Sequence, residues 1–126
     1  MAAATLRRWT GMDRVLVALL AIAYVPGAPG LGVDTRVLTG TTAGVLTIVF
    51  TLAFFAPIVA VALSWRIPLA AAWIALAGGI VAVVLGVLDL VGALAGPPPA
   101  GMVVVDVVLI VLGAAVAWRA WGLART

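Results

Sequence analysis

The chain has 126 residues, of which 67% are hydrophobic and 9% are charged. A soluble domain has about 45–50% apolar and about 25% charged residues, so this composition excludes a soluble globular fold. Seven arginines and four aspartates give a net charge of +3. These arginines do not form the dense basic face that binds phosphates, so we expect no nucleic-acid partner.

The first candidate membrane span covers residues 12–33, but its apolar sequence is uninterrupted only over residues 15–25. A membrane-spanning helix needs about 20 apolar residues. Either the helix begins earlier, near Thr5, with its arginines reaching to the membrane surface, or the segment 26–32 completes the crossing as irregular backbone. A cleaved signal peptide is the third alternative, disfavoured because PGAPGLG is a poor cleavage site. The sequence therefore predicts a short or broken first span.

Three longer apolar segments follow, and each is long enough to cross a membrane as a helix. They cover residues 41–64, 68–95 and 102–121. Pro68 suits the first turn of a helix, whereas Pro57 should kink the helix that contains it. Because the connections are short, consecutive helices should be antiparallel neighbours. We therefore expect an all-α integral membrane protein with one membrane domain over residues 1–126, an up-down-up-down bundle of four transmembrane helices.

The orientation follows from the arginines near the ends of the spans. Six of them flank the ends that share a side with the two termini, and Arg36 alone lies on the opposite side. Positively charged residues accumulate on the cytoplasmic side. All five tryptophans also lie near that same boundary. The sequence predicts a multi-pass protein of the plasma (inner) membrane, of bacterial type, with the N-terminus and C-terminus in the cytoplasm.

Small residues recur at helical spacing in the last three candidate spans. In a membrane, such stripes allow helices to approach closely. Ordinary packing within one bundle is the favoured interpretation, and a pore-lining or dimer face is the alternative. The residues of these expected packing faces are Ala75, Gly79, Ala82 and Gly86 in the third span, Gly113 and Ala117 in the fourth, and Gly40 and Gly44 in the second.

Two of the four aspartates, Asp89 and Asp106, lie in apolar sequence on either side of the triple proline at residues 97–99. Helical spacing turns both toward the interior, about 8–10 Å from the turn between the spans. Arg36 and Asp34 should lie at the same outer end. We expect a candidate polar cluster in which Arg36 pairs with Asp89 or Asp106. Alternatively, the two carboxyls face each other and share a proton or a cation.

The sequence contains no His, Cys, Glu or Lys. It therefore lacks the usual ligands of haem and transition metals, and we expect no cofactor, no metal site and no enzymatic activity. The expected partners are the lipid bilayer and either further copies of the chain or a larger membrane complex. The predicted function is that of an accessory, scaffold or stabilising membrane subunit. The alternative is a homo-oligomeric transporter or channel, coupled to protons or cations, that uses Asp89 and Asp106.

Overall fold

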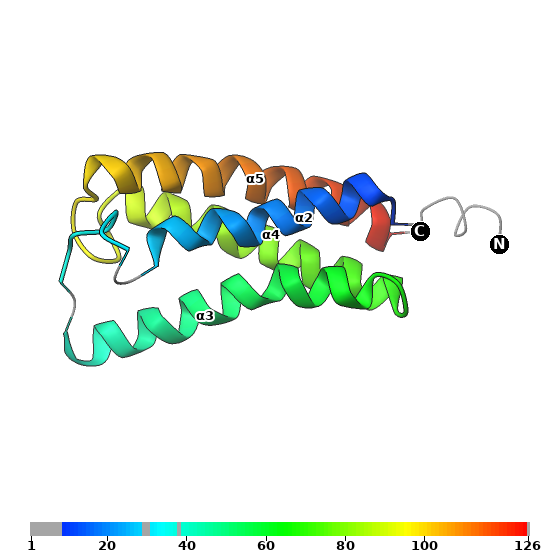
Figure 1. Cartoon of the computed structure of the whole chain (residues 1–126), viewed down its shortest axis with the longest axis horizontal. Coiled ribbons are helices and arrows are strands. Elements are labelled where there is room, and N and C mark those ends of the chain that lie inside the picture. Colours follow the sequence, from blue (N-terminus) through cyan, green and yellow to red (C-terminus); the bar gives the residue numbers. More distant parts are fainter. Residues whose placement is uncertain (1–8, 29–30, 38, 126) are drawn as a thin grey trace.

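The computed structural model describes residues 9–28, 31–37 and 39–125. Its regular elements in this part of the chain are all helical: α2 (Gly11–Tyr24), the short 3-10 helix η1 (Val25–Gly27), α3 (Gly40–Leu63), α4 (Pro68–Leu90) and α5 (Ala100–Ala124). The α-helices lie alongside one another and alternate in direction (Figure 1). Three of them, α3, α4 and α5, are long and apolar enough to cross a membrane. The prediction of a helical chain with segments able to cross a membrane is confirmed at this level.

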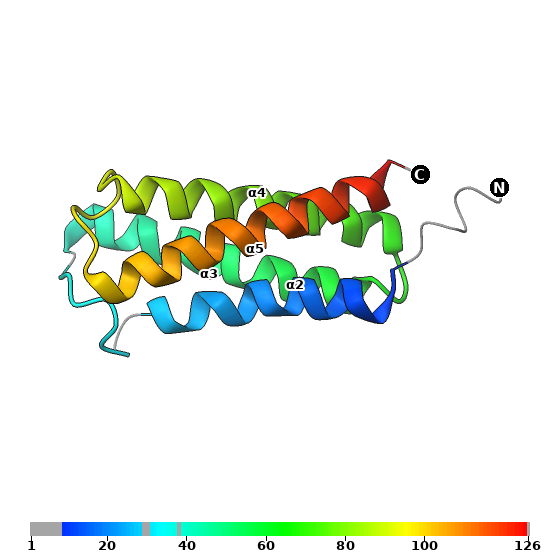
Figure 2. The same ribbon diagram turned by 90° about the horizontal axis from the view of Figure 1, so that it is seen from above.

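The molecule has two ends, a loop end and a terminal end. The loop end consists of residues 25–28, 31–37 and 89–106, and the terminal end consists of residues 9–14, the turn at 64–67 and residues 118–125. Figure 2 shows both ends from a second direction. Of the arginines that the structure describes, Arg14, Arg66, Arg119 and Arg125 lie at the terminal end, and Arg36 lies at the loop end.

Helix α2 is short because strong signals begin and end it. Thr10 and Asp13 form a reciprocal capping box that starts the helix at Gly11. Beyond Tyr24, Pro26 leads the chain into η1. The 14 residues of α2 extend for about 21 Å, so the helix occupies only the first part of the predicted span 12–33. The alternative start near Thr5 lies outside the described residues.

Helix α4 ends earlier than predicted. Its last residue is Leu90, five residues before the expected bound at 95, because Gly92 adopts a positive φ of 78°. The amide of Ala93 donates to the Leu88 carbonyl and the amide of Gly92 donates to the Asp89 carbonyl. This pair of bonds is a Schellman motif, which terminates helices at a glycine. Asp89 consequently lies in the last turn of α4 and not about 10 Å inside the helix.

The closest helix contact joins α4 and α5 through their glycines. A Cβ added at Gly79 would lie 2.6 Å from the Gly113 carbonyl oxygen and 2.7 Å from the Ala117 nitrogen. A Cβ added at Gly86 would lie 2.9 Å from the Asp106 carbonyl oxygen. The backbones of the two helices therefore touch at these positions, which requires residues without a side chain. The structure places Ala75 and Ala82, also on this face, in the buried core.

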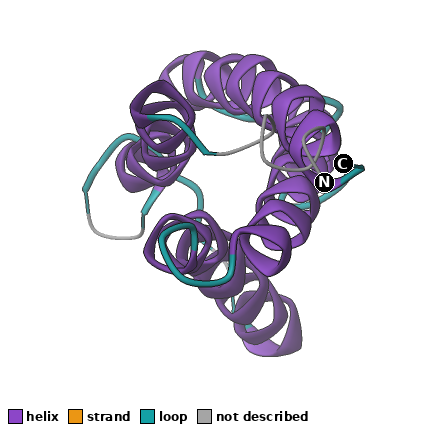
Figure 3. Cartoon of the chain, turned by 90° about the vertical axis from the view of Figure 1, so that its right-hand side faces the viewer, coloured by secondary structure: helices purple, strands orange, loops and turns teal. Residues whose placement is uncertain are grey.

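The structure differs from the sequence prediction at the other two glycines. Gly40 and Gly44 are exposed, and a Cβ added at either would meet nothing within 4 Å. They therefore form no packing face within the described chain. Helix α3 instead packs through Ala53, Pro57 and Ala60, its buried residues. All three lie in its second half, because the first half diverges from the other helices toward the loop end (Figures 1 and 3).

Polar contacts hold the helices together at the terminal end. Trp9 Nε1 donates to the Pro68 carbonyl at 3.1 Å, which joins the start of α2 to the start of α4. Arg14 Nε donates to Ser64 Oγ at 2.7 Å, next to the end of α3. The helices are therefore tied together at the terminal end, whereas α3 stands apart at the loop end.

Candidate functional site at the loop end

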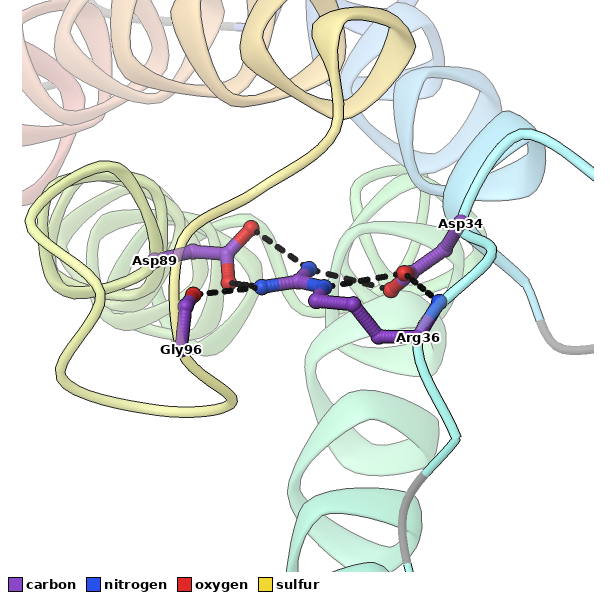
Figure 4. Close-up of polar contacts among 4 residues, drawn as sticks. All are labelled: Asp34, Arg36, Asp89 and Gly96. Carbon is purple, nitrogen blue, oxygen red and sulfur yellow. Dashed lines mark hydrogen bonds and ion pairs between the residues drawn. The ribbon is translucent and has the colours of Figure 1, made fainter.

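A charged cluster of Asp34, Arg36 and Asp89 lies at the loop end (Figure 4). Arg36 and Asp89 form a two-pronged ion pair, with Nη1 to Oδ1 at 2.8 Å and Nη2 to Oδ2 at 3.1 Å. Asp34 approaches from the other side, with Arg36 Nε to Oδ1 at 2.9 Å and Nη2 to Oδ2 at 3.0 Å. The guanidinium therefore lies between two carboxylates. Arg36 thus pairs with Asp89, one of the two aspartates expected from the sequence as its partner.

Local backbone geometry positions both carboxylates. The Arg36 amide donates to Asp34 Oδ1 at 3.1 Å, so the side chain of Asp34 closes a turn typical of this residue type. Asp89 is positioned by the Schellman end of α4. A third acceptor, the Gly96 carbonyl, receives a bond of 3.0 Å from Arg36 Nη1. Arg36 therefore joins the segment before α3 to the end of α4 and to the connection that follows it.

The electrostatic effects within this cluster favour its ionised state. The Arg36 guanidinium beside Asp34 holds the pKa of that carboxyl below its usual value of 3.8, although partial burial acts in the opposite direction. The carboxylates of Asp34 and Asp89 in turn raise the pKa of Arg36. The side chains of Arg36 and Asp89 are only 14% and 9% exposed. A charge pair this well buried depends on its partners, because each member alone would be costly to desolvate.

Arg36 has no hydrogen left for a fourth group. A guanidinium carries five N–H bonds, and the side chain of Arg36 makes five hydrogen bonds to Asp34, Asp89 and Gly96. Asp106 is not among these acceptors. Arg36 therefore pairs with Asp89 and not with Asp106. The side chain of Asp106 lies within hydrogen-bonding reach of Asp89, so the arrangement in which the two carboxyls face each other also stays a prediction.

Asp106 lies in the second turn of α5 and is buried, with 3% of its surface exposed. Its Oδ2 has no hydrogen-bond partner among the described residues. It lines a cavity of about 670 Å³ that Asp89 also borders. The first half of α3, the end of α4 and the start of α5 form the walls of this cavity. Asp106 therefore borders a space large enough for a small organic molecule.

A second charged contact, at the terminal end, was not among the residues expected from the sequence. Arg119 Nε lies 2.5 Å from Asp13 Oδ1, and the same carboxylate caps α2 through the Thr10 amide at 2.8 Å. The Thr10-x-x-Asp13 spacing is a signal for a helix start and indicates the cap. Nothing local in the sequence indicates Arg119, which is 106 residues away. This ion pair fastens the start of α2 to the end of α5.

The described residues contain no group of three or more His, Cys, Asp or Glu side chains that could hold a metal ion. In the cluster of Asp34, Arg36 and Asp89, every side-chain donor of Arg36 is already used. Asp106 is the group at the loop end that is available to accept a hydrogen bond or a positive charge. No protein-family model, curated protein or solved structure matches this chain.

Proposed function

We propose that the chain is an integral membrane protein with four crossings, in which α2 and the segment after it form the first. The outward face of α2 supports this, because its exposed side chains are apolar and suit lipid. They are Met12, Val15, Leu19 and Ile22. With the irregular residues that follow α2, this segment could reach across the hydrocarbon if the neighbouring helices shield its backbone.

The distribution of arginines supports an orientation with both termini in the cytoplasm of a bacterial cell, across its plasma membrane. Arg14, Arg66, Arg119 and Arg125 belong to the terminal end, and Arg36 is the described arginine at the loop end. The positive-inside rule then assigns the terminal end to the cytoplasm. Trp73 and Trp121, which meet edge to face with ring centroids 6.3 Å apart, suit the membrane boundary on that side.

Labelling of single cysteines tests this topology without background, because the chain has no cysteine of its own. We expect Thr35→Cys to react with a membrane-impermeant maleimide in intact cells, and Gly11→Cys and Ile67→Cys to react only in inverted vesicles. Labelling of Gly11→Cys together with Thr35→Cys would contradict a crossing by α2. A fully reversed pattern would contradict the orientation.

Within the membrane, we propose that the protein catalyses no reaction and acts as an accessory, scaffold or stabilising subunit. The observation that carries this proposal is the use of charged side chains as ties between helices. Asp13 pairs with Arg119, and Asp34 and Asp89 both pair with Arg36. Three of the four aspartates are therefore engaged in holding the structure, which leaves few groups for acid–base or nucleophilic work.

Purification from native membranes in a mild detergent tests this function. We expect a second membrane protein in fixed ratio to the chain, and a lower steady-state level of that protein when the chain is deleted. Recovery of the chain by itself, with unchanged levels of other membrane proteins after deletion, would contradict an accessory role. Recovery as a homo-oligomer without another protein would favour the second function below.

The second candidate function is transport coupled to a proton or cation, by a homo-oligomer. Asp106 favours it, because an ionisable side chain within a membrane segment and next to a cavity marks many ion pathways. Flux measured in proteoliposomes tests it. We expect proton or cation flux that is lost in Asp106→Asn and in Asp89→Asn plus Asp106→Asn, but kept in the cavity-wall variant Thr51→Val. Absence of flux in the wild type would contradict transport.

A further inference from the structure

Two buried side-chain atoms lack a hydrogen-bond partner in the described part of the chain: Asp106 Oδ2 and Tyr24 Oη. Both residues line the 670 Å³ cavity at the loop end. Tyr24 is 1% exposed and Asp106 is 3% exposed. Buried polar atoms are nearly always paired, since leaving one unpaired costs the free energy of removing it from water. That both exceptions line one cavity indicates a place for a ligand with a polar group.

The charged residues around the cavity determine which charge the polar group of the ligand should carry. Asp34, Asp89 and Asp106 line it together with a single cation, Arg36. All five N–H groups of Arg36 are used by Asp34, Asp89 and Gly96. The other described arginines belong to the terminal end. The cavity therefore has an excess of negative charge, which favours a cation and disfavours an anion.

The remaining walls select an organic cation over a metal ion. They are mainly apolar, and the larger of these side chains are Leu46, Phe50, Leu85, Met102 and Leu109. A hard metal ion takes about six or more oxygen ligands, and the described residues offer no group of three metal-binding side chains. The rings of Tyr24 and Phe50 meet edge to face with centroids 5.5 Å apart. An aromatic pair in the wall suits a cation with an apolar body.

The cavity is accessible, because part of its wall is also part of the molecular surface. Thr47 and Thr51 on α3 are exposed and line it. Their hydroxyls donate back to the carbonyls of Ala43 and Thr47, so their hydrogens are already used within α3. A molecule can therefore enter beside the first half of α3, where this helix stands apart from α4.

We infer that this cavity binds an amphipathic organic monocation, an ammonium group attached to an apolar body. The ammonium donates to Asp106 Oδ2, the Tyr24 hydroxyl bonds to the same ligand, and the apolar body lies among the side chains of α3, α4 and α5. This inference goes beyond the proposed function, because binding is compatible with an accessory subunit and with a transporter.

Calorimetric titration of the whole protein in phosphatidylcholine nanodiscs tests the inference. The probe is 4-phenylbutylamine, its neutral isostere is 4-phenyl-1-butanol, and empty nanodiscs correct for partition into lipid. We expect saturable binding of the amine and at least tenfold weaker binding of the alcohol. Asp106→Asn should weaken amine binding at least tenfold, and Tyr24→Phe should weaken it a few-fold. Thr42→Val, on α3 but outside the cavity wall, should leave the affinity unchanged.

Asp106→Asn replaces the buried carboxyl, whose Oδ2 has no hydrogen-bond partner among the described residues, by an amide of nearly the same shape, so it should fold about as well as the wild type. Leu46→Trp provides a second variant, which fills the cavity from α3 without changing any charge and should abolish binding. Equal affinities for amine and alcohol, or undiminished amine binding in Asp106→Asn or Leu46→Trp, would overturn the inference. The topology and the partner of the chain are measured separately, so failure here leaves those proposals standing.

Discussion

Arg36 and Asp89 face each other across 53 positions of sequence, and two parallel hydrogen bonds of 2.8 and 3.1 Å join the guanidinium to the carboxylate. This pair closes the loop end of the molecule, because it connects the segment before α3 to the last turn of α4. Through its remaining donors, Arg36 also binds Asp34 and Gly96. One arginine therefore organises most of the polar groups at this end.

Removal of Arg36 should destabilise the protein strongly. In Arg36→Ala, Asp89 keeps its buried position without a partner, and loss of one member of a buried pair costs about 3 kcal/mol or more. Arg36→Lys keeps the charge but loses the fork that binds both oxygens, so its stability should be intermediate. Thermal unfolding in detergent measures both effects. The double variant Arg36→Met plus Asp89→Leu should recover most of the loss, and equal stability of wild type and Arg36→Ala would contradict a structural role for the pair.

The glycines between α4 and α5 should not accept a methyl group. Gly79→Ala and Gly113→Ala each place a Cβ within 3 Å of the facing backbone, which forces the helices apart and should cost about 1–3 kcal/mol. Gly44→Ala is the matched control, because a Cβ there meets nothing and alanine favours a helix by up to about 1 kcal/mol. Melting temperatures in one detergent compare the three. A drop for Gly44→Ala as large as that for Gly79→Ala would contradict the described packing.

Loss of Asp13 should loosen the terminal end. Asp13→Ala removes both the capping interaction with Thr10 and the ion pair with Arg119. A helix cap contributes about 1 kcal/mol, and the pair adds a modest amount because Arg119 is 40% exposed. We expect a total loss of about 1–2 kcal/mol in unfolding experiments. Arg66→Ala, an exposed arginine at the same end, should have little effect, and similar losses in the two variants would argue against the Asp13 contact.

The contribution of Asp34 should depend on pH. Hydrogen bonding to Arg36 lowers the pKa of Asp34 below 3.8 in the folded protein. A group whose pKa is lower when folded stabilises the protein above its unfolded pKa, and this stabilisation disappears as the pH falls through the folded pKa. The stability difference between wild type and Asp34→Asn should therefore be constant above about pH 5 and shrink below about pH 4. Thermal unfolding from pH 7 to pH 3 measures this difference, with Thr35→Ala as the neighbouring control. A difference that grows on acidification would have the wrong sign.

The helices could be predicted well from local sequence, and their ends less well. Apolar runs indicated α3, α4 and α5 to within a few residues at most ends. The end of α4 was wrong by five residues, because Gly92 terminates the helix inside a sequence that is apolar enough to continue it. Spacing predicted packing faces that include Gly79 and Gly113, which the structure brings into contact, but the same reasoning also marked Gly40 and Gly44, which are exposed. Helical spacing specifies a face, and it does not specify whether a neighbour covers that face.

For the charged residues, too, the sequence indicated local interactions but not the contacts between distant segments. The Thr10-x-x-Asp13 cap is a local signal, whereas the Asp13 contact with Arg119 depends on how α2 and α5 are placed. For Arg36 the sequence left two acceptors open, Asp89 and Asp106. The early end of α4 and the course of the chain before α3 bring Asp89 to the guanidinium, and five hydrogen bonds then use all of its donors.

Composition and apolar run length were sufficient to establish a helical protein with segments able to cross a membrane, because both properties act on each helix separately. The cavity beside Asp106 depends on the tertiary structure. It exists because α3 is tied to its neighbours at the terminal end and has its buried residues, Ala53, Pro57 and Ala60, in its second half. That divergence is a relation between helices, and it leaves two buried polar residues, Asp106 and Tyr24, bordering the same cavity.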